Sequence, residues 1–503
     1  MNNYIIKTIL AALLLLCSAR LSAQTSFNEK IVSTSGVTSS KELICDYGNY
    51  SVAYTYSITT AEVAHFFTIQ NLTTGVTKKF TMHQDYIQNH VYLHPTTYTI
   101  NDISISDMGI CYFCGCKTEE DETPPSPPGP PVINRNSTSG STGFIGLFSI
   151  SDVFNGNGEF FLLEFDDVSN LTRIEAEGSY VQIYAVGTFR QTSSSGTISS
   201  RSCLLGLIPP ESFNINTIWH YDLAIPTDDS EFFTDVADCG VGVVVSSRFQ
   251  EDPSHIGFYH IKNGISTNAT GVVGYCNKYD LASAMSSFSS SHISRTDSDP
   301  IMFTHGAYEA SVILPCSYPS GQDGIAAFRI SVPTPGNVSL HNGIVVHTPA
   351  YVNLLDGIST YHNSTEKYAL LVENPVSGQD ILYLVPWSIA SSTAVSPFAC
   401  NHSAKRWQQL TTYSIDSRMY LHLIGHNSFN RLITQHYISN IPYTPAAGSS
   451  CISFGSLTTA YHLSTPNKTT LGRVGIIKEN FEVPPQKTTV TVTTLQNTVT
   501  CNN

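Results

Sequence analysis

The chain has few charged residues, and few of them are basic. Asp, Glu, Lys and Arg make up only 13% of its 503 residues, and Lys and Arg together number 25 against 39 acids. Affinity for nucleic acid comes from clustered Lys and Arg, so a formal net charge of -14 argues against a nucleic acid partner. No stretch beyond the N-terminus approaches the ~18 consecutive apolar residues of a spanning helix, so we expect no membrane span.

The sequence also lacks the local motifs that mark catalytic and cofactor sites. It contains no nucleophile motif, no phosphate-binding Gly loop and no nucleotide fingerprint. Ser, Thr, Tyr, Phe and Gly are abundant instead, which suits short strands and tight turns better than surface helices. We therefore expect an all-β protein, and we assign no catalytic residue, no metal site and no cofactor.

The N-terminus predicts export. Residues 1–7 carry one positive charge, residues 8–16 form an apolar run too short to span a bilayer, and small residues follow up to Ala23. This pattern is typical of a secretory signal peptide over residues 1–23. The mature protein is then expected to be secreted, or to reside in the periplasm or cell envelope.

One sequence pattern, a β-rich apolar run, a short turn and a second β-rich run, occurs seven times. The runs open at Tyr50, Met108, Tyr180, Cys239, Tyr308, Lys367 and Arg418, an average spacing of about 61 residues. The turn SerGlyGlnAsp occurs twice with an identical sequence, at 320–323 and at 377–380. A unit of this length fits four strands of ~5–6 residues with generous loops.

The order of polar and apolar strands within a unit indicates how the units pack. A polar, acid-containing stretch precedes each hairpin, as at 100–107, 173–178, 232–238 and 412–416, and a more variable stretch follows it. The polar strand is expected to be innermost and the two apolar strands to be covered on both faces by neighbouring units. In spacing and strand pattern the chain resembles the β-propeller superfamily over residues 27–480. The resemblance implies an architecture and no activity, because the Trp-Asp, kelch and sialidase boxes are missing.

We therefore predict a seven-bladed β-propeller of four-stranded blades over residues 24–483. Residues 27–32 (PheAsnGluLysIleVal) are placed to join the last blade and close the ring. Residues 451–457 and 471–477 could complete that blade or form an eighth, and a string of tandem β-sandwich domains is the competing architecture. Two stretches fall outside the pattern: a Pro-rich acidic loop at 117–143, and a C-terminal tail at 484–503 without apolar mass to anchor it.

Two groups of Cys and His residues are of types that bind metals. Cys111, Cys114 and Cys116 lie on one predicted strand, where Cys111 points away from the other two, so buried thiols between blades are favoured over a metal site or a disulfide. His422 and His426 share a strand face, with His436 on the partner strand, and we favour ordinary packed histidines there. The mature chain keeps eleven Cys, an odd number.

A propeller would gather the acids of the innermost strands around one channel. Asp102, Glu175, Asp235, Asp297 and Asp416 come from five units, and converging carboxylates suit a cation, an amine or a sugar. The plainer alternative is that these acids bond to neighbouring backbone groups. As ligand-binding candidates in the funnel we name Arg173, Glu175, Asp235, Tyr361 and His362.

The function that these features favour is binding. We expect an exported binding or scaffold protein of the cell envelope or extracellular space, with a glycan or protein ligand. The alternative is a polysaccharide-acting enzyme, a glycoside hydrolase or lyase, that uses acids of the funnel.

Overall fold

The structure is a computed structural model of the chain. The described residues are 27–31, 43–58, 63–83, 96–119, 141–176, 183–192, 198–207, 218–221, 231–240, 242–249, 254–262, 272–284, 294–295, 299–306, 308–317, 323–334, 337–348, 353–362, 365–374, 379–389, 391–395, 397–399, 406–415, 418–426, 432–438, 453–454, 458–475, 479–481, 486–489, 491–495 and 498–502. The predicted signal peptide lies outside them. Within them, no helix is long and apolar enough to cross a membrane.

The described strands form seven antiparallel sheets, numbered here in chain order. Sheet 1 contains β2 (Leu43–Tyr47), β3 (Tyr50–Ile58), β4 (Val63–Asn71) and β5 (Thr77–His83). Sheet 2 contains β6 (Thr96–Ile105), β7 (Ile110–Glu119), β8 (Ser141–Ser149) and β9 (Glu159–Phe165), with the short helix α2 (Ile150–Phe154) between the last two. Sheet 3 contains β10 (Val168–Glu175), β11 (Ile183–Thr192), β12 (Ile198–Leu207) and β13 (Ile218–Tyr221).

The other four sheets follow the same order. Sheet 4 contains β14 (Glu231–Asp238), β15 (Gly242–Phe249), β16 (His255–Lys262) and β17 (Val272–Asp280), followed by α3 (Leu281–Ala284). Sheet 5 contains β18 (Ser294–Arg295), β19 (Ile301–Gly306), β20 (Glu309–Ser317), β21 (Asp323–Thr334), β22 (Asn337–Thr348) and β26 (Ser392–Val395). Sheet 6 contains β23 (Asn353–His362), β24 (Thr365–Asn374), β25 (Gln379–Pro386) and β27 (Pro397–Ala399), and sheet 7 contains β28 (Arg406–Ile415), β29 (Arg418–His426) and β30 (Leu432–Ile438).

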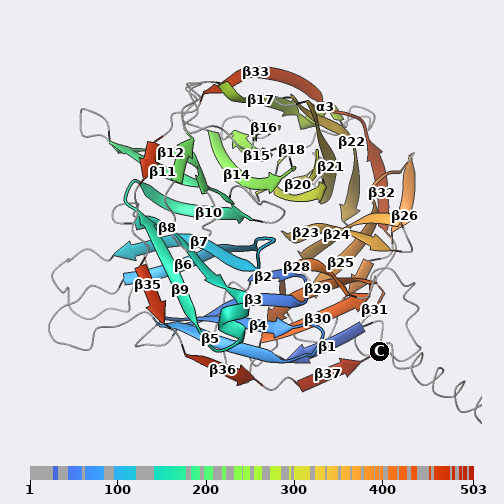
Figure 1. Ribbon diagram of the computed structural model, residues 1–503. Helices are drawn as coiled ribbons and strands as arrows, with labels where there is room; N and C mark the ends of the chain where they lie inside the picture. Colours follow the sequence, from blue (N-terminus) through green and yellow to red (C-terminus); the bar gives the residue numbers. More distant parts are fainter. Residues whose placement is uncertain are drawn as a thin grey trace, which may run out of the picture.

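The sheets close into a ring around their first strands (Figure 1). In chain order β2, β6, β10, β14, β19, β23 and β28 each contact the next, and β28 contacts β2. Each predicted hairpin opens at or within three residues of the second strand of a sheet, and the polar stretches fall on the first strands. The all-β β-propeller is confirmed, and a string of separate sandwiches is wrong, because the contacts between sheets form a single closed cycle.

Core layers lie between neighbouring sheets, which explains the continuous apolar runs of the middle strands. Leu370 and Leu371 are adjacent on β24 and both are fully buried, yet Leu370 packs toward sheet 5 and Leu371 toward sheet 7. A small layer of Ile44, Ala53 and Ile424 joins sheets 7 and 1, where the ring closes. Both faces of each middle strand are therefore covered, as the sequence pattern predicted.

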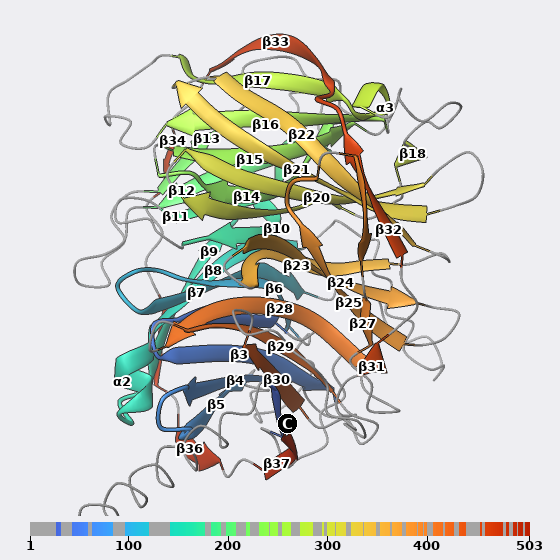
Figure 2. The ribbon, with the colours of Figure 1, turned by 90° about the vertical axis from the view of Figure 1, so that its right-hand side faces the viewer.

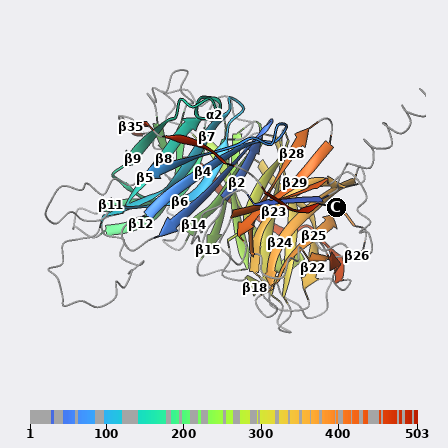
Figure 3. The same cartoon turned by 90° about the horizontal axis from the view of Figure 1, so that it is seen from below.

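The predicted closing strand is present. β1 (Phe27–Ile31) pairs antiparallel with β30, so the N-terminal segment becomes part of the last sheet. Figure 3 shows the blue strands of sheet 1 beside the orange strands of sheet 7 at this junction. The ring is thus held at its seam by backbone hydrogen bonds between the two ends of the propeller as well as by side-chain packing.

The C-terminal segment corrects two predictions. Its strands are β31 (Ser453–Phe454), β32 (Thr458–Leu463), β33 (Asn467–Gly475), β34 (Glu479–Phe481), β35 (Gln486–Thr489), β36 (Val492–Leu495) and β37 (Thr498–Asn502). They pair in turn with the outer strands of sheets 6, 5, 4, 3, 2, 1 and 7. The sheets therefore have five or more strands, not four, and this segment forms neither an eighth blade nor a free tail after 484. Figures 1 and 2 show it in red along the periphery.

The Pro-rich segment is shorter than predicted at both ends. β7 extends to Glu119 and β8 begins at Ser141, with Thr118 opposite Ser141 in the register. Residues 117–119 and 141–143 are therefore strand and not loop, because they continue the ladder of the second hairpin. Residues 120–140 lie outside the described part of the chain.

Candidate functional site

The first strands share a bulge that sets the residues around the axis. In β6, β10, β14, β23 and β28 the register shifts by one residue, and the residues that follow the bulge are Asp102, Arg173, Asp235, Asp356 and Gln409. A bulge re-aims the side chain beside it and increases the local twist. Five units of the repeat thus place a polar group at an equivalent position near the centre of the ring.

Four of these side chains bind the backbone of the next sheet. Asp102 accepts the N–H of Ile174 at 3.0 Å and Asp235 accepts that of Met302 at 2.6 Å. Asp356 and Gln409 do the same for Leu410 at 2.8 Å and Ile44 at 2.6 Å. The bonds always run from one first strand to the next, so these side chains hold neighbouring sheets together. This favours the backbone-binding alternative for the central acids.

Arg173 occupies the same position and is the exception, since a guanidinium cannot accept a hydrogen bond. It lies between two carboxylates instead, with Nη1 at 3.9 Å from Asp102 and Nε at 3.9 Å from Asp235. In the sheet that follows, the N–H of Val236 is bound by the carboxylate of Asp235 itself at 2.9 Å. At this position the side chain to backbone hydrogen bond between first strands is therefore missing, and Arg173 forms ion pairs with the acids of both neighbouring first strands instead.

Burial and mutual charge set the ionisation of this cluster. Burial raises the pKa of Asp235 to about 6, against the lowering effect of Arg173 and of the Met302 N–H. Burial likewise raises the pKa of Asp356 to about 7, against the N–H groups of Leu410 and Gly357 and the more distant Arg173. Burial lowers the pKa of Arg173, but the carboxylates, Asp235 first, outweigh it and raise that pKa overall. The guanidinium is thus the fixed charge of the cluster.

The structure brings together two of the five predicted ligand-binding residues. Arg173 and Asp235 are in contact, and Glu175 lies two residues further along β10, half-buried and opposite Tyr184. Tyr361 and His362 end β23, with Tyr361 opposite Glu366, and their side chains lie outside the described residues. Asp297 and Asp416 also lie outside them. Ligand binding by the five residues stays a prediction.

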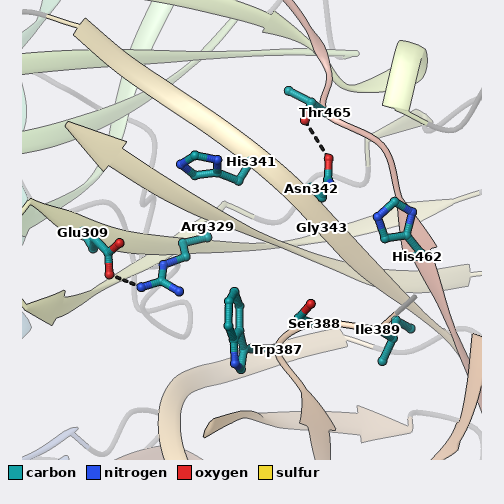
Figure 4. Close-up of a pocket in the computed structure, with 10 residues that line it drawn as sticks. All are labelled: Glu309, Arg329, His341, Asn342, Gly343, Trp387, Ser388, Ile389, His462 and Thr465. Atoms are coloured by element: carbon teal, nitrogen blue, oxygen red, sulfur yellow. Dashed lines mark hydrogen bonds and ion pairs between the residues drawn. The ribbon is translucent and has the colours of Figure 1, made fainter. Parts of the chain in front are cut away.

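A groove between sheets 5 and 6 is the candidate site that the sequence did not indicate. It has a volume of about 780 Å³. Its lining residues lie on β20, β21, β22 and β32 or directly follow β25 and β32, and they are Glu309, Arg329, His341, Asn342, Gly343, Trp387, Ser388, Ile389, His462 and Thr465 (Figure 4). The volume falls in the range of small-molecule sites.

An arginine at the centre of the groove links its polar and aromatic parts. Arg329 forms an ion pair with Glu309, and its guanidinium lies 4.7 Å from the centre of the Trp387 ring (Figure 4). On the next strand, exposed His341 contacts the hydroxyl of Ser331 at 2.6 Å. Thr465 donates to the amide oxygen of Asn342 at 2.7 Å. The groove thus offers an indole, imidazoles, an amide and a neutralised ion pair within one hollow.

A hydrogen-bonded chain of two half-buried and two buried side chains lies at the same interface, between sheets 5 and 6. Glu366 contacts His305 Nδ1 at 2.7 Å, His305 Nε2 contacts the Ser311 hydroxyl, and that hydroxyl lies 3.1 Å from the Tyr368 hydroxyl. Burial lowers the pKa of His305. The order acid, imidazole and hydroxyl resembles a catalytic triad. Ser311 is fully buried, however, so no substrate reaches it, and we assign the chain to the packing of the two sheets.

Cys111, Cys114 and His422 are buried between neighbouring sheets, Cys116 is half-buried, and the side chains of His426 and His436 lie outside the described residues. Cys111 belongs to the layer between sheets 1 and 2, and Cys114 to the layer between sheets 2 and 3, which confirms that they point to opposite faces of β7. His422 is fully buried and lies 3.1 Å from Asp46 of sheet 1. Within the described ranges, no three or more His, Cys, Asp and Glu are grouped so that they could hold a metal.

Comparison with known proteins gives little similarity. No protein-family model matches the sequence, and no curated protein matches it. Among solved structures, that of the polysaccharide lyase Uly1 is similar with a TM-score of 0.36 and 9% identity, over 81% of the present chain and 91% of that chain. A match of this quality carries no argument about the activity of the present chain.

No short motif in the sequence marks the residues of the groove. Glu309, Arg329 and His341 lie on three successive strands, and Trp387 follows a fourth in the next sheet. Their meeting depends on how two sheets pack, which no short motif records. Only Trp387 could have been noticed, because the chain has just three Trp and this one ends an apolar run.

Proposed function

We propose that the protein is an exported, seven-bladed β-propeller that binds glycans in the groove between sheets 5 and 6. In this proposal each of the seven sheets counts as one blade and the ring is a rigid platform. The observation that carries the proposal is the groove itself, where Trp387 lies beside the Arg329–Glu309 pair, His341 and Asn342. An indole offers a large apolar surface to the C–H face of a sugar, and the polar groups can bond to its hydroxyls. The proposed location outside the cell follows from the signal peptide predicted over 1–23.

The composition of the groove favours binding over hydrolysis. Glycoside hydrolysis uses two carboxyl groups, ~5–10 Å apart, one on each side of the scissile bond. Among the described residues that line the groove, Glu309 is the only acid, and it is paired with Arg329. A hydrolase that works through two acids of this groove is therefore not supported, and turnover of a bound glycan would be the observation in favour of the enzyme.

The Trp387→Ala variant is expected to lose glycan affinity by about tenfold or more, since a truncated Trp at a binding site typically costs over ~1.4 kcal/mol. A glycan array with the purified wild-type protein selects the ligand, and titration calorimetry then compares the variants. His341→Ala is the second variant, because His341 is exposed and its removal should leave the fold intact.

The matched control is Phe66→Ala on sheet 1. Lys79 lies over the Phe66 ring at 3.7 Å, so this variant also removes the aromatic half of a cation–π pair, far from the groove in the chain and on another sheet. Its glycan affinity should equal that of the wild type. Equal affinity of Trp387→Ala, His341→Ala and the wild type would overturn the groove as the site.

A further inference from the structure

The outer edges of the sheets are covered by a segment that comes from the far end of the chain. We call residues 453–502 the C-terminal belt. Without it, β9, β5 and β1 would each end their sheet with a row of unpaired N–H and C=O groups on one side, and such edges readily accept another strand. In the folded chain β35, β36 and β37 take these places, with Thr489 opposite Glu159, Thr493 opposite Lys79 and Asn502 opposite Asn28.

In the last part of the belt, the side chains that the structure describes are exposed or half-buried, while the backbone pairs with the neighbouring strands. The side chains of Gln486, Lys487, Thr493 and Thr494 are exposed. Val492 is half-buried against the layer between sheets 1 and 2. Lys487 and Glu159 form an ion pair at 2.7 Å, with side chains 54% and 45% exposed, and such surface pairs contribute about 0–1 kcal/mol. Recognition of the belt thus depends on strand pairing. Every copy of the chain offers the same acceptor edges, so a belt can pair with the edges of another copy as well as with its own.

We propose that the edges of β9, β5 and β1 form a strand-acceptor surface that takes residues 486–502 from a second copy of this chain. The contacts in the exchanged dimer are the same as those in the monomer, so the two differ in free energy mainly through the linking residues 482–485 and the cost of association. A short link gives the chain's own belt an effective concentration in the mM range. Exchange is therefore expected during folding at high protein concentration, when the edges and the belts of several copies are open together.

A disulfide across the acceptor edge distinguishes the two arrangements in the full chain. Lys79 and Thr493 are direct partners in the register, and the Thr493 hydroxyl donates to the Lys79 carbonyl at 3.3 Å. The Lys79→Cys, Thr493→Cys double variant is refolded over a range of concentrations and then oxidised. We expect a covalent dimer whose fraction rises with concentration during refolding and exceeds that of either single Cys variant several-fold on a non-reducing gel.

Each outcome decides the proposal. A double variant that forms no more covalent dimer than the single variants, at every concentration, overturns it. Should this pair prevent folding, Lys78→Cys with Thr494→Cys tests the same edge, because these residues are the next partners in the register. As a further control, Thr493→Pro removes a backbone donor and a ladder position, and in the Lys78→Cys, Thr494→Cys background it should reduce both the intrachain and the interchain disulfide.

Discussion

Replacing Arg173 by Met is expected to destabilise the folded protein by about 3 kcal/mol at pH 8, the lower end of the usual cost of stranding a buried charge, since the Asp102 and Asp235 side chains are only 11% and 9% exposed while that of Arg173 is 29% exposed. Arg173 is within 3.9 Å of the carboxylates of both Asp102 and Asp235, and its charge also lowers the pKa of Asp356. Met fills a similar space but leaves these acids without a shared cation. Urea unfolding of the two proteins measures the difference.

The loss should be smaller at pH 5 than at pH 8. The pKa values of Asp235 and Asp356 are raised from 3.8 to about 6 and about 7 in the folded state. At a pH between 3.8 and these raised values, each carboxyl group therefore keeps a proton in the folded state that it releases in the unfolded chain. Such groups make the protein less stable as the pH rises from 4 through 7, and the effect of this pair is absent below about pH 4. Without Arg173 both pKa values rise further, so acid neutralises the stranded carboxylates and recovers part of the stability.

Arg248→Met is the matched control for this experiment. Arg248 forms an ion pair with Asp299 at 3.1 Å, but the side chains are 32% and 56% exposed, so its loss should cost less than about 1 kcal/mol. Adding Asp235→Asn to Arg173→Met should restore stability at pH 8, because the amide oxygen still accepts the Met302 N–H without a charge. Equal losses for Arg173→Met and Arg248→Met would show that the central cluster does not hold the sheets.

The propeller could be predicted because each repeat contains two strands whose side chains are nearly all apolar. A middle strand covered on both faces must be apolar throughout, so the seven hairpins stand out, and the spacing between them reports the size of a sheet. The first strands could be placed at the axis because they alternate polar and apolar residues. Arg173 and Asp235 were found for this reason, although the interpretation of their carboxylate and guanidinium groups required the distances between first strands.

The belt and the groove could not be predicted, for two different reasons. The strands β35 and β36 of the belt pair through their backbone and leave residues such as Lys487 and Thr493 exposed, so the sequence there looks like a polar tail. The groove unites Arg329 and Trp387 from two sheets, and only the packing angle between those sheets brings the side chains within 4.7 Å. A single sequence records which faces are buried, and it does not record which polar residues meet at a sheet boundary.

Gly187→Ala and Gly115→Ala are expected to destabilise the protein by about 3 kcal/mol or more, at or above the usual range for overpacking. Both glycines face the residue that precedes a bulge on the first strand, Leu171 and Ile100 respectively. A Cβ atom would lie 2.0 Å from the Asn170 carbonyl oxygen at position 187, and 1.8 Å from the Thr99 carbonyl oxygen at position 115. Backbone atoms cannot rotate away as a side chain can, so the bulge itself must move.

Movement of the bulge would displace the residue that follows it, Arg173 in one variant and Asp102 in the other. The matched control is Gly48→Ala, where φ is +53° and nothing lies within 4 Å of the added Cβ, so only about 1 kcal/mol of backbone strain is expected. Gly187→Ala should also widen the difference in stability between pH 5 and pH 8, because moving the guanidinium away from its carboxylates raises their pKa values further, and stability then falls more steeply as the pH rises. If Gly187→Ala unfolds at the same urea concentration as Gly48→Ala, close contact between the bulge and the second strand is not what positions Arg173.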